Sequence, residues 1–399
     1  MIREFRLKKL KKIQEPYPAK TTMPYYGRIR SIRQHGGSIF AHIDKQQIYL
    51  KKDILGKKFE EFKNIFDIGD IIEVKGKTFK TRTGENTIEV RGFNMLAKSI
   101  RPLPEKWYGL KDKEIRFRKR YLDLLMNEEA IKIFEKRSEI IRKIRAFLDK
   151  NNFIEVETPI LQTIPGGTLA KPFKTHLNAL DLDLYLRIAP ELYLKRLLVG
   201  GFERVYEIGR CFRNEGMDKN HNPDFTMLEF YVSYWDFEKL MDFTEKLMQE
   251  FGFPEKWTRA EYSKIVRNSE KEAFQKIKKP TFVWGHPLEI SPLAKKIDSK
   301  RAARFQGIIN GIEIINAYSE LNNPIEQKER FKEQETMRKK GDQEAHRMDK
   351  DFIEALEYGM PPAAGLGMGI DRLTMLLTNA KTLREVILFP TMRPKKLTK

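Results

Sequence analysis

The chain has almost no cysteine, since Cys211 is the only one among 399 residues. A single cysteine excludes a disulfide within the chain, and a reducing cytoplasm is the simplest compartment for such a protein. Long apolar runs are also missing, so the sequence predicts neither a membrane-spanning helix nor a signal-peptide core. We therefore expect a cytoplasmic globular protein. Cys211 is interpreted as a small packing residue, because a catalytic thiol needs a base partner.

Acidic residues are scarce relative to basic ones, with 56 Asp and Glu against 76 Lys and Arg. The resulting formal charge of +20 is larger than solubility requires. Such a surplus is typical of proteins with a polyanionic partner, and nucleic acid fits best. The chain is also long enough, at 40% hydrophobic residues, for two domains and a large core.

The first third of the chain changes character twice. Residues 2–13 are basic and predict a solvated lead-in helix, which a break at residues 16–18 (Pro-Tyr-Pro) ends. Residues 23–98 consist of short β-rich runs separated by turns, and five such strands predict an OB-fold barrel. Barrels of this kind bind single-stranded nucleic acid with aromatic and basic side chains. Residues 101–104 (Arg-Pro-Leu-Pro) read as a linker.

A helix and a strand follow the linker. Apolar residues recur at helical spacing through residues 127–150, and residues 153–157 predict a strand that Thr158 and Pro159 close. An ordinary helix packed on a sheet gives the same periodicity.

The most informative stretch is a turn-rich loop between two strand-like runs, residues 213–216 (Arg-Asn-Glu-Gly) and 221–231 (His-Asn-Pro-Asp-Phe-Thr-Met-Leu-Glu-Phe-Tyr). Because alternate side chains of a strand share a face, Phe225, Glu229 and Tyr231 project the same way. Arg213 and Glu215 do the same across the hairpin. One wall then carries a guanidinium, an aromatic plate and acids, which suits a nucleoside triphosphate beside a cationic small molecule. A charged surface hairpin is the competing interpretation.

A second pattern lies at residues 365–372, which read Gly-Leu-Gly-Met-Gly-Ile-Asp-Arg. The spacing does not match the dinucleotide-binding fingerprint G-x-G-x-x-G. Three alternate glycines on an apolar strand instead expose flat backbone against which a base can lie, and Asp371 and Arg372 lead into a helix.

Together these stretches resemble the motifs of the class II aminoacyl-tRNA synthetases. The hairpin is similar to motif 2, residues 365–372 to motif 3, and the helix, strand and proline at 127–159 to motif 1. Three further stretches are similar to the lysine-specific members: residues 165–167 (Pro-Gly-Gly), 189–195 (Ala-Pro-Glu-Leu-Tyr-Leu-Lys) and 313–322 (Glu-Ile-Ile-Asn-Ala-Tyr-Ser-Glu-Leu-Asn). The resemblance runs from about residue 16 to residue 394.

The resemblance implies an α+β fold class, with an N-terminal OB-fold β-barrel followed by a class II synthetase catalytic domain whose antiparallel sheet is flanked by helices. The implied segments are a lead-in helix (1–20), an anticodon-binding domain (21–100), a linker (101–112) and the catalytic domain (113–399). The implied activity is ATP-dependent activation of L-lysine to lysyl-adenylate and transfer to the 3′ end of lysine tRNA, with Mg²⁺ as cofactor and a homodimer as the assembly. Residues 235–280 predict two helical segments and little else. This region is short for the stretch between motifs 2 and 3, so the chain resembles a trimmed, bacterial-type form.

The matched motifs also imply the site residues. Arg213, on the α-phosphate and the attacking carboxylate, and Arg372, on the γ-phosphate, are the expected catalytic residues. The expected ATP-binding residues are Arg213, Glu215, His221, Phe225, Glu313, Gly369 and Arg372. The expected lysine-binding residues are Gly167, Glu191, Glu229, Tyr231, Asn316 and Glu320. The expected metal ligands are Glu313 and Gln306, and the expected anticodon-binding residues are Arg28, Phe40 and Gln47.

Two of these residues have a second interpretation, and two positions depart from the family. Phe40 suits the barrel core as well as base stacking, and Glu191 at a helix start suits the helix dipole as well as an ammonium group. Gln306 stands where the family has its second magnesium-binding glutamate, and Asn220 stands where many bacterial relatives have an arginine.

Strand alternation places Glu313 on a different face from the expected lysine-binding residues of the same segment. Asn316 and Glu320 share a face, whereas Glu313 falls on the other, so we expect a bulge or strong local twist to redirect Glu313.

Two other functions compete. A synthetase-like ligase that adds lysine or a lysine isomer to a protein is disfavoured by the barrel, which such relatives lack. A catalytically inactive RNA-binding paralogue is disfavoured because Arg213 and Arg372 are both retained.

Overall fold

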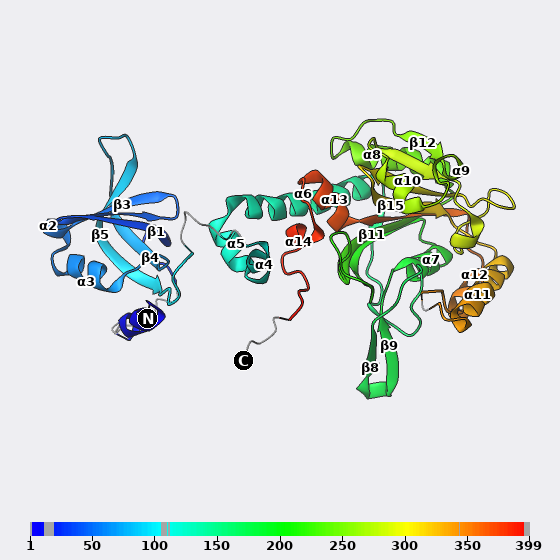
Figure 1. Cartoon of the computed structure of the whole chain (residues 1–399), viewed down its shortest axis with the longest axis horizontal. Coiled ribbons are helices and arrows are strands. Elements are labelled where there is room, and N and C mark those ends of the chain that lie inside the picture. Colours follow the sequence, from blue (N-terminus) through cyan, green and yellow to red (C-terminus); the bar gives the residue numbers. More distant parts are fainter. Residues whose placement is uncertain (1, 12–19, 105–109, 111, 343, 395–399) are drawn as a thin grey trace. The chain divides into compact units, whose positions relative to one another are not determined.

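The computed structural model describes residues 2–11, 20–104, 110, 112–342 and 344–394 (Figure 1). It divides into two compact units, Met1–Lys111 (unit 1) and Asp112–Lys399 (unit 2). The helix break expected at residues 16–18 lies outside the described residues. Within the described ranges, no helix is long and apolar enough to cross a membrane.

Unit 1 is a closed barrel with the strand order β1-β2-β3-β5-β4, which confirms the predicted barrel. Neighbouring strands are antiparallel except for the parallel pair β3 and β5. Alternate residues such as Ile39, Ala41 and Ile43 on β2 point inward and are buried, as strand alternation requires. The elements of unit 1 are α1 (Ile2–Leu10), β1 (Tyr25–His35), β2 (Ser38–Ile43), β3 (Gln46–Lys51), α2 (Lys52–Leu55), α3 (Lys57–Ile65), β4 (Ile71–Lys80) and β5 (Asn86–Ala97).

The lead-in helix α1 is mostly exposed to solvent, as expected, but two of its basic side chains contact the barrel. Arg6 is 8% exposed, and its Nη1 donates to the carbonyl oxygens of Ile68 (3.1 Å) and Ser99 (3.0 Å). Lys9 donates to Asp67 Oδ1 at 2.8 Å. The barrel loops supply acceptors for these two cations, and such distant partners leave no trace in the periodicity of the helix.

Unit 2 is built on an eight-stranded sheet with the order β12-β13-β14-β15-β16-β11-β10-β6. All neighbouring pairs are antiparallel except two at the edges, β12 with β13 and β6 with β10, so the predicted antiparallel sheet flanked by helices is confirmed. A second sheet with the order β7-β9-β8 includes the β8–β9 hairpin that projects from unit 2 (Figure 1).

The elements of unit 2 are α4 (Lys113–Arg118), α5 (Arg120–Met126), α6 (Glu128–Lys150), β6 (Ile154–Glu155), β7 (Leu161–Gln162), β8 (Lys174–Leu177), η1 (Asn178–Leu180), β9 (Leu182–Leu186), α7 (Glu191–Val199), β10 (Arg204–Phe212), β11 (Asp224–Ser233), α8 (Phe237–Gln249), β12 (Thr258–Glu261), α9 (Tyr262–Ile265), α10 (Glu270–Gln275), β13 (Thr281–Trp284), η2 (Leu288–Ile290), β14 (Arg304–Ile309), β15 (Ile312–Ser319), α11 (Pro324–Lys339), α12 (Lys350–Glu357), β16 (Ala363–Gly369), α13 (Ile370–Leu377) and α14 (Leu383–Val386).

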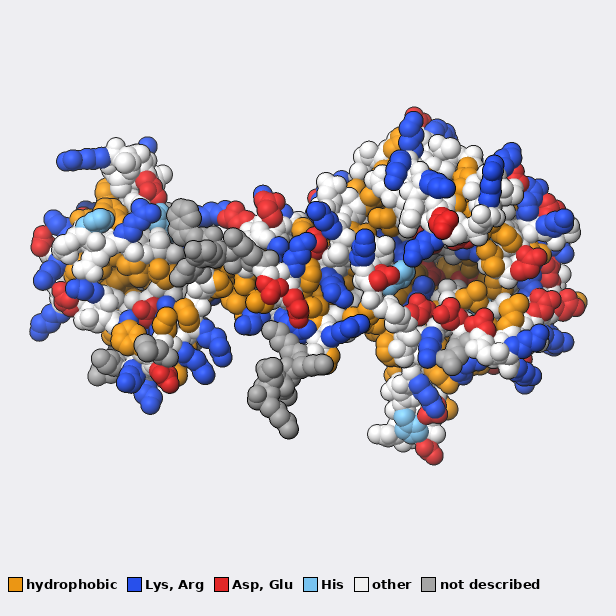
Figure 2. Space-filling view, viewed as in Figure 1, with side chains coloured by type: hydrophobic (Ala, Val, Ile, Leu, Met, Phe, Trp, Pro, Cys, Tyr) orange, Lys and Arg blue, Asp and Glu red, His pale blue; other side chains and the backbone are white. Residues whose placement is uncertain are grey.

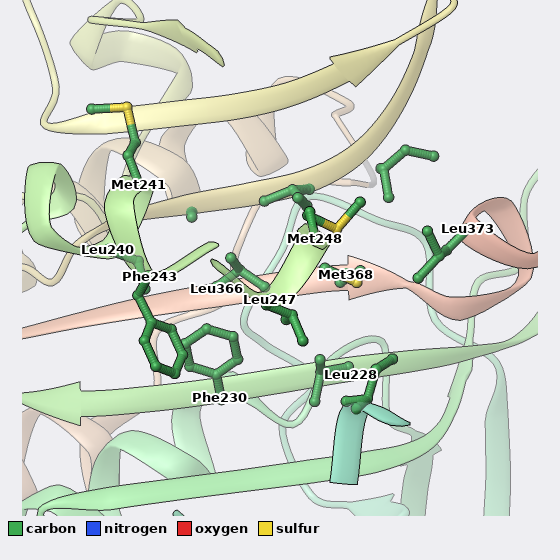
Figure 3. Packing of buried hydrophobic residues seen from close by; sticks show 14 of the residues in the cluster. Leu228, Phe230, Leu240, Met241, Phe243, Leu247, Met248, Leu366, Met368 and Leu373 are labelled. Atoms are coloured by element: carbon green, nitrogen blue, oxygen red, sulfur yellow. The ribbon is translucent and has the colours of Figure 1, made fainter. Parts of the chain in front are cut away.

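One face of the large sheet forms the core of unit 2. Leu228 and Phe230 of β11 and Met368 of β16 pack with Phe243 and Leu247 of α8 (Figure 3). Full burial of each such side chain stabilises the fold by roughly 1.5–3 kcal/mol. Because side chains alternate along a strand, the intervening residues of β11 and β16 face the opposite side of the sheet, and the site lies there.

The expected irregularity at Glu313 is confirmed. Pairing between β14 and β15 passes from Gly307 with Ile315 to Ile308 with Glu313, so Ile314 has no partner and the strand carries a bulge. Both Glu313 and Ile314 line the cavity described below.

Candidate active site

A cavity of about 260 Å³ opens on the sheet face opposite the core. Figure 2 shows this hollow in unit 2, with acidic and hydrophobic side chains inside it. The structure brings together at this cavity all but one of the residues expected for ATP, lysine and metal, and the one that is not in the lining is Glu320. The lining includes Gly167, Glu191, Arg213, Glu215, His221, Phe225, Glu229, Tyr231, Gln306, Glu313, Asn316, Gly369 and Arg372.

Arg213 and Phe225 form one wall of the cavity. β10 ends just before Arg213, and its last pairs set Cys211 opposite Phe225, so strand alternation carries Arg213 to the same side. The Arg213 guanidinium carbon lies 4.9 Å from the centroid of the Phe225 ring. Arg213 Nε is buried and finds no acceptor in the described part of the chain. It is therefore free to donate to an anion in the cavity.

Cys211 is a packing residue, as predicted. Its side chain is buried, and burial raises the pKa of the thiol to about 12, so it stays protonated at neutral pH.

Arg372 lies where three segments meet. Its Nη1 donates to the backbone oxygen of Glu313 at 3.0 Å, and its Nη2 lies 3.3 Å from His221 Nε2. His221 Nδ1 lies 2.9 Å from Asp218 Oδ1, which orients the ring. Glu313 contributes a carboxylate oxygen 4.0 Å from Arg372 Nη1. The Arg372 guanidinium and the Glu313 carboxylate thus share this end of the cavity.

Asp371 joins the three motif-like segments. Its Oδ1 lies 2.6 Å from Arg137 Nη1 of α6, and its Oδ2 accepts from the backbone nitrogen of Thr226 on β11 at 3.0 Å. Arg137 Nη2 also donates to the Thr226 hydroxyl at 3.0 Å. A single buried carboxylate therefore fixes α13 against both β11 and α6, a role that the sequence did not reveal.

The alternate glycines of β16 lie between β11 and β15, where the absence of side chains leaves room for the cavity. Gly365 pairs with Tyr231 and Gly369 pairs with Met227. A Cβ atom at Gly365 would lie 2.3 Å from both Glu320 Oε1 and Tyr231 Cε1, closer than real contacts allow. At Gly369 the nearest atom to such a Cβ belongs to Arg372, at 3.8 Å. The structure therefore requires glycine at 365 on account of the acidic pocket.

The Gly365 end of the cavity is acidic. Glu229 and Glu320 are 4% and 1% exposed, and the Tyr231 hydroxyl donates to Glu229 Oε2 at 2.9 Å. Burial, followed by repulsion from Glu191, raises the pKa of Glu229 well above its usual value. Burial raises the pKa of Glu320 to about 8, against the opposing charge of Lys195. Burial thus disfavours the ionised form of both acids, and a cation bound beside them would favour that form.

Glu191 begins α7 directly after Pro190, and Gly167 packs against it. Gly167 has a φ of +96°, and a Cβ there would lie 2.8 Å from Glu191 Cβ. The Glu191 side chain turns into the acidic pocket, where its Oε1 accepts from the Tyr318 hydroxyl at 2.5 Å. The alternative of a helix-dipole partner does not account for these contacts.

Sequence reasoning missed Arg304, which lines the cavity from β14. Its Nε donates to Asn316 Oδ1 at 2.9 Å, which leaves the Asn316 amide nitrogen as a donor. Arg304 pairs with Tyr318, and Gln306 pairs with Asn316. Strand alternation from Gln306 was the signal that could have identified Arg304.

Gln306 is held by a buried histidine. His286 is fully buried, and its Nε2 lies 2.6 Å from Gln306 Oε1. Burial lowers the pKa of His286 to about 3, so the ring is neutral. No group of three or more His, Cys, Asp or Glu side chains suited to a metal occurs among the residues that the structure describes. The carboxylate of Glu313 nevertheless fits Mg²⁺, which usually binds one or two carboxylates together with substrate phosphates.

The three expected anticodon residues all lie on the outside of the barrel. Phe40 is not a core residue, because its neighbours Ile39 and Ala41 point inward, and its ring centroid lies 4.6 Å from that of Tyr49. Gln47 donates to Glu85 Oε2 at 2.7 Å.

The Arg28 side chain is likewise tied to a loop, since its Nη1 donates to the Gly69 oxygen at 2.6 Å. Tyr49 and Phe79, whose rings are 6.0 Å apart, continue the aromatic row and were not predicted.

The sequence model of the family described as tRNA synthetases class II (D, K and N) matches residues 112–393. A protein of Pelotomaculum thermopropionicum named "Lysine--tRNA ligase" is 49% identical over 433 positions, covering 92% of this chain and 86% of that protein. Proteins of the same name from Thermotoga maritima and Aquifex aeolicus are 43% and 46% identical, covering 99% and 93% of this chain and 97% and 73% of their own lengths.

The first of these alignments spans more positions than the 399 residues of this chain, so that relative carries segments which this chain lacks, as a trimmed form predicts. The chain belongs to the class II tRNA synthetases of the D, K and N family.

Proposed function

We propose that the chain activates L-lysine with ATP to form lysyl-adenylate and transfers the lysyl group to the 3′ end of lysine tRNA. One observation carries this proposal: a single cavity has two chemically opposite ends. The carboxylates of Glu191, Glu229 and Glu320 gather near Gly365, and Arg372 lies beyond Gly369 at the other end of the same strand. A cationic amino acid suits the first end, and the phosphates of ATP suit the second.

Activation forms a bond between a carboxylate oxygen of lysine and the α-phosphorus of ATP, while the bond from that phosphorus to the bridging oxygen of pyrophosphate breaks. No protein nucleophile is needed, so positioning and charge neutralisation supply most of the rate. Arg213 holds the α-phosphate and the attacking carboxylate, and Phe225 stacks on the adenine. Arg372 and His221 bind the outer phosphates, and Glu215 contacts the adenine.

Selectivity for lysine follows from the acids. Glu191 and the Gly167 carbonyl bind the α-ammonium, while Glu229, Tyr231 and Glu320 bind the ε-ammonium. A neutral side chain in their place would leave a buried acid unpaired, at a cost of roughly 1–3 kcal/mol. The Asn316 amide, which Arg304 orients, donates to the substrate carboxylate.

Mg²⁺ is the proposed cofactor, and Glu313 is the residue that would hold it. Gln306 is the proposed second ligand, although its Oε1 already lies within hydrogen-bonding distance of His286. When bound, the ion neutralises charge on the phosphate oxygens.

The barrel supports tRNA as the acceptor of the lysyl group. A protein-modifying ligase needs no nucleic-acid module, whereas this barrel presents a row of aromatic rings on its outer face. Lys and Arg side chains are spread over the visible face of the protein (Figure 2). We propose Arg28, Phe40 and Gln47 as anticodon contacts, a homodimer formed through the motif 1 segment, and a cytoplasmic location.

Lysine-dependent exchange of pyrophosphate into ATP, measured on the full chain, tests the activation step. Charging of transcribed lysine tRNA, compared with an anticodon-swapped transcript, tests the acceptor. We expect exchange with lysine and none with asparagine or aspartate. Exchange without charging of tRNA would favour the protein-modifying alternative, and no exchange at all would favour the inactive one.

A further inference from the structure

Lys195 lies just behind the acidic pocket and has no place in the function proposed so far. It is on α7, one helical turn after Glu191, and its side chain is fully buried. Its ammonium nitrogen is 2.6 Å from Glu191 Oε1 and also contacts Glu320 Oε2. A buried ammonium costs folding free energy, so its presence here requires an explanation.

The charges around the pocket explain why a buried ammonium group is present here. Glu191, Glu229 and Glu320 are at most 4% exposed, and all three converge on the same space. Lys195 is the cation that contacts two of them, so the ionised group carries two net negative charges. An α,ω-diamino acid brings two ammonium groups, whereas ordinary amino acids bring one.

Lys195 also decides which carboxylate oxygens are left for the ligand. Glu191 Oε1 already accepts from Lys195 and from the Tyr318 hydroxyl at 2.5 Å, which leaves Oε2 for the cavity. Glu320 Oε1 points to the space above Gly365 and accepts no hydrogen bond in the described part of the chain. Lys195 therefore orients two acids so that each offers one oxygen.

We propose that Lys195 is an internal counter-ion, a positioning residue that sets the pocket at two net negative charges and so matches it to the two ammonium groups of a diamino acid. This inference rests on the proposed lysine activation. Neither Lys195 nor Glu320 lines the cavity, so Lys195 acts through Glu191, which does line it, and through Glu320, whose Oε1 lies beside Gly365 of the lining.

The titratable groups around Lys195 determine whether lysine binding should improve or weaken as pH rises. Its charged and titratable neighbours are Glu191, Glu320, Tyr318 and His346. Burial keeps His346 neutral by lowering its pKa to about 4, and Tyr318 stays protonated because burial raises the pKa of its hydroxyl.

Among the groups that contact Lys195, Glu320 has a raised pKa that Lys195 holds down, whereas the causes of the raised pKa of Glu229 are its burial and the nearby acids. Lysine binds the ionised form of Glu320, so its affinity improves as pH rises through the pKa of that acid. Without Lys195, the improvement moves to higher pH.

The test is Lys195→Met in the full chain, with Lys328→Met as the matched control, because Lys328 is an exposed helical lysine elsewhere in unit 2. Lysine binding without ATP is measured by calorimetry across neutral and alkaline pH, and KM values for lysine and ATP are taken from exchange. We expect the Lys195→Met protein to bind lysine about tenfold more weakly at neutral pH for each unit by which the pKa of Glu320 rises. The ATP KM and the control should match the parent protein.

A charge-restoring pair makes the test sharper. With all acids ionised, Lys195→Met leaves three net negative charges, and adding Glu229→Gln returns the count to two. The double variant should bind lysine more tightly than Lys195→Met, although Glu229→Gln alone weakens binding. Lys195→Arg keeps the cation and should keep the pH midpoint of the parent, and Lys195→Gln replaces the Met variant if that protein does not fold.

Two results overturn the inference while leaving the proposed function standing. One is an unshifted pH midpoint in the neutral variants, and the other is simple addition of the two losses in the double variant. A parent protein that neither binds lysine nor exchanges pyrophosphate would overturn the proposed function itself, and this inference with it.

Discussion

Substituting Gly365 by alanine adds one methyl group at the boundary between the acidic pocket and the strand floor. The new Cβ would lie 2.3 Å from Glu320 Oε1 and 2.3 Å from Tyr231 Cε1. Both neighbours are buried, at 1% and 3% exposure, so neither can swing into open solvent. Both must therefore move by about an ångström, unless the strand itself shifts, and both are proposed lysine ligands.

The size of the effect follows from the cost of overpacking a well-filled site, about 1–3 kcal/mol. If that cost falls on lysine binding, it corresponds to roughly a fivefold to 150-fold rise in the lysine KM. The ATP KM should stay near that of the parent protein, because the phosphate-binding residues lie toward the other end of β16. Pyrophosphate exchange at varied lysine and at varied ATP measures both quantities, and urea denaturation separates loss of binding from loss of folding.

Gly369→Ala is the matched control on the same strand. Its Cβ would meet nothing nearer than Arg372 at 3.8 Å, and its φ of −75° suits any residue. The control should therefore keep the lysine KM. A Gly365→Ala protein with unchanged lysine KM and unchanged stability would refute the packing argument, and equal losses in both variants would show that the strand matters only as a whole.

Three further changes test other parts of the site. Glu320→Gln keeps the shape of the side chain but removes its charge, so lysine binding should weaken by roughly 1.5–3 kcal/mol, seen as a higher lysine KM, while the ATP KM stays unchanged. A lysine KM equal to that of the parent protein would show that Glu320 does not bind lysine. Gln306→Glu adds a carboxylate near Glu313, so the Mg²⁺ concentration for half-maximal exchange should fall, and superimposable titrations would deny Gln306 any part in metal binding. Asp371→Asn leaves Arg137, whose side chain is only 16% exposed, without its counter-charge. The free energy of unfolding, measured by urea denaturation, should fall by about 3–5 kcal/mol, and a loss under 1 kcal/mol would show that the pair is incidental.

Local sequence pattern determined the elements and the faces of the strands that form the site. Alternation along residues 221–231 placed Phe225, Glu229 and Tyr231 on one side, and the observed pairing of Cys211 with Phe225 and of Tyr231 with Gly365 agrees. The parity conflict at Glu313 predicted a bulge that the structure contains. These inferences succeed because side chains alternate regularly along a strand, so that a break in the alternation itself indicates a bulge.

The same reasoning failed where a short element depends on its surroundings. Two helical segments were expected within residues 235–280, whereas the structure has α8, α9 and α10 together with β12. β12 is four residues long and exists through its parallel pairing with β13. A strand of that length has no periodicity of its own to read.

Only the tertiary structure decided which distant residues share an environment. Lys195 meets Glu320, His286 meets Gln306, and Arg6 of α1 meets the loops of the barrel, although no spacing in the sequence links the members of any pair. Whether a charge is buried, and beside which partner, depends on the register of strands and the packing of helices far apart in the chain. The sequence therefore determined the fold, the family and most of the residues around the cavity, while the charge balance of the pocket became visible only once the chain was folded.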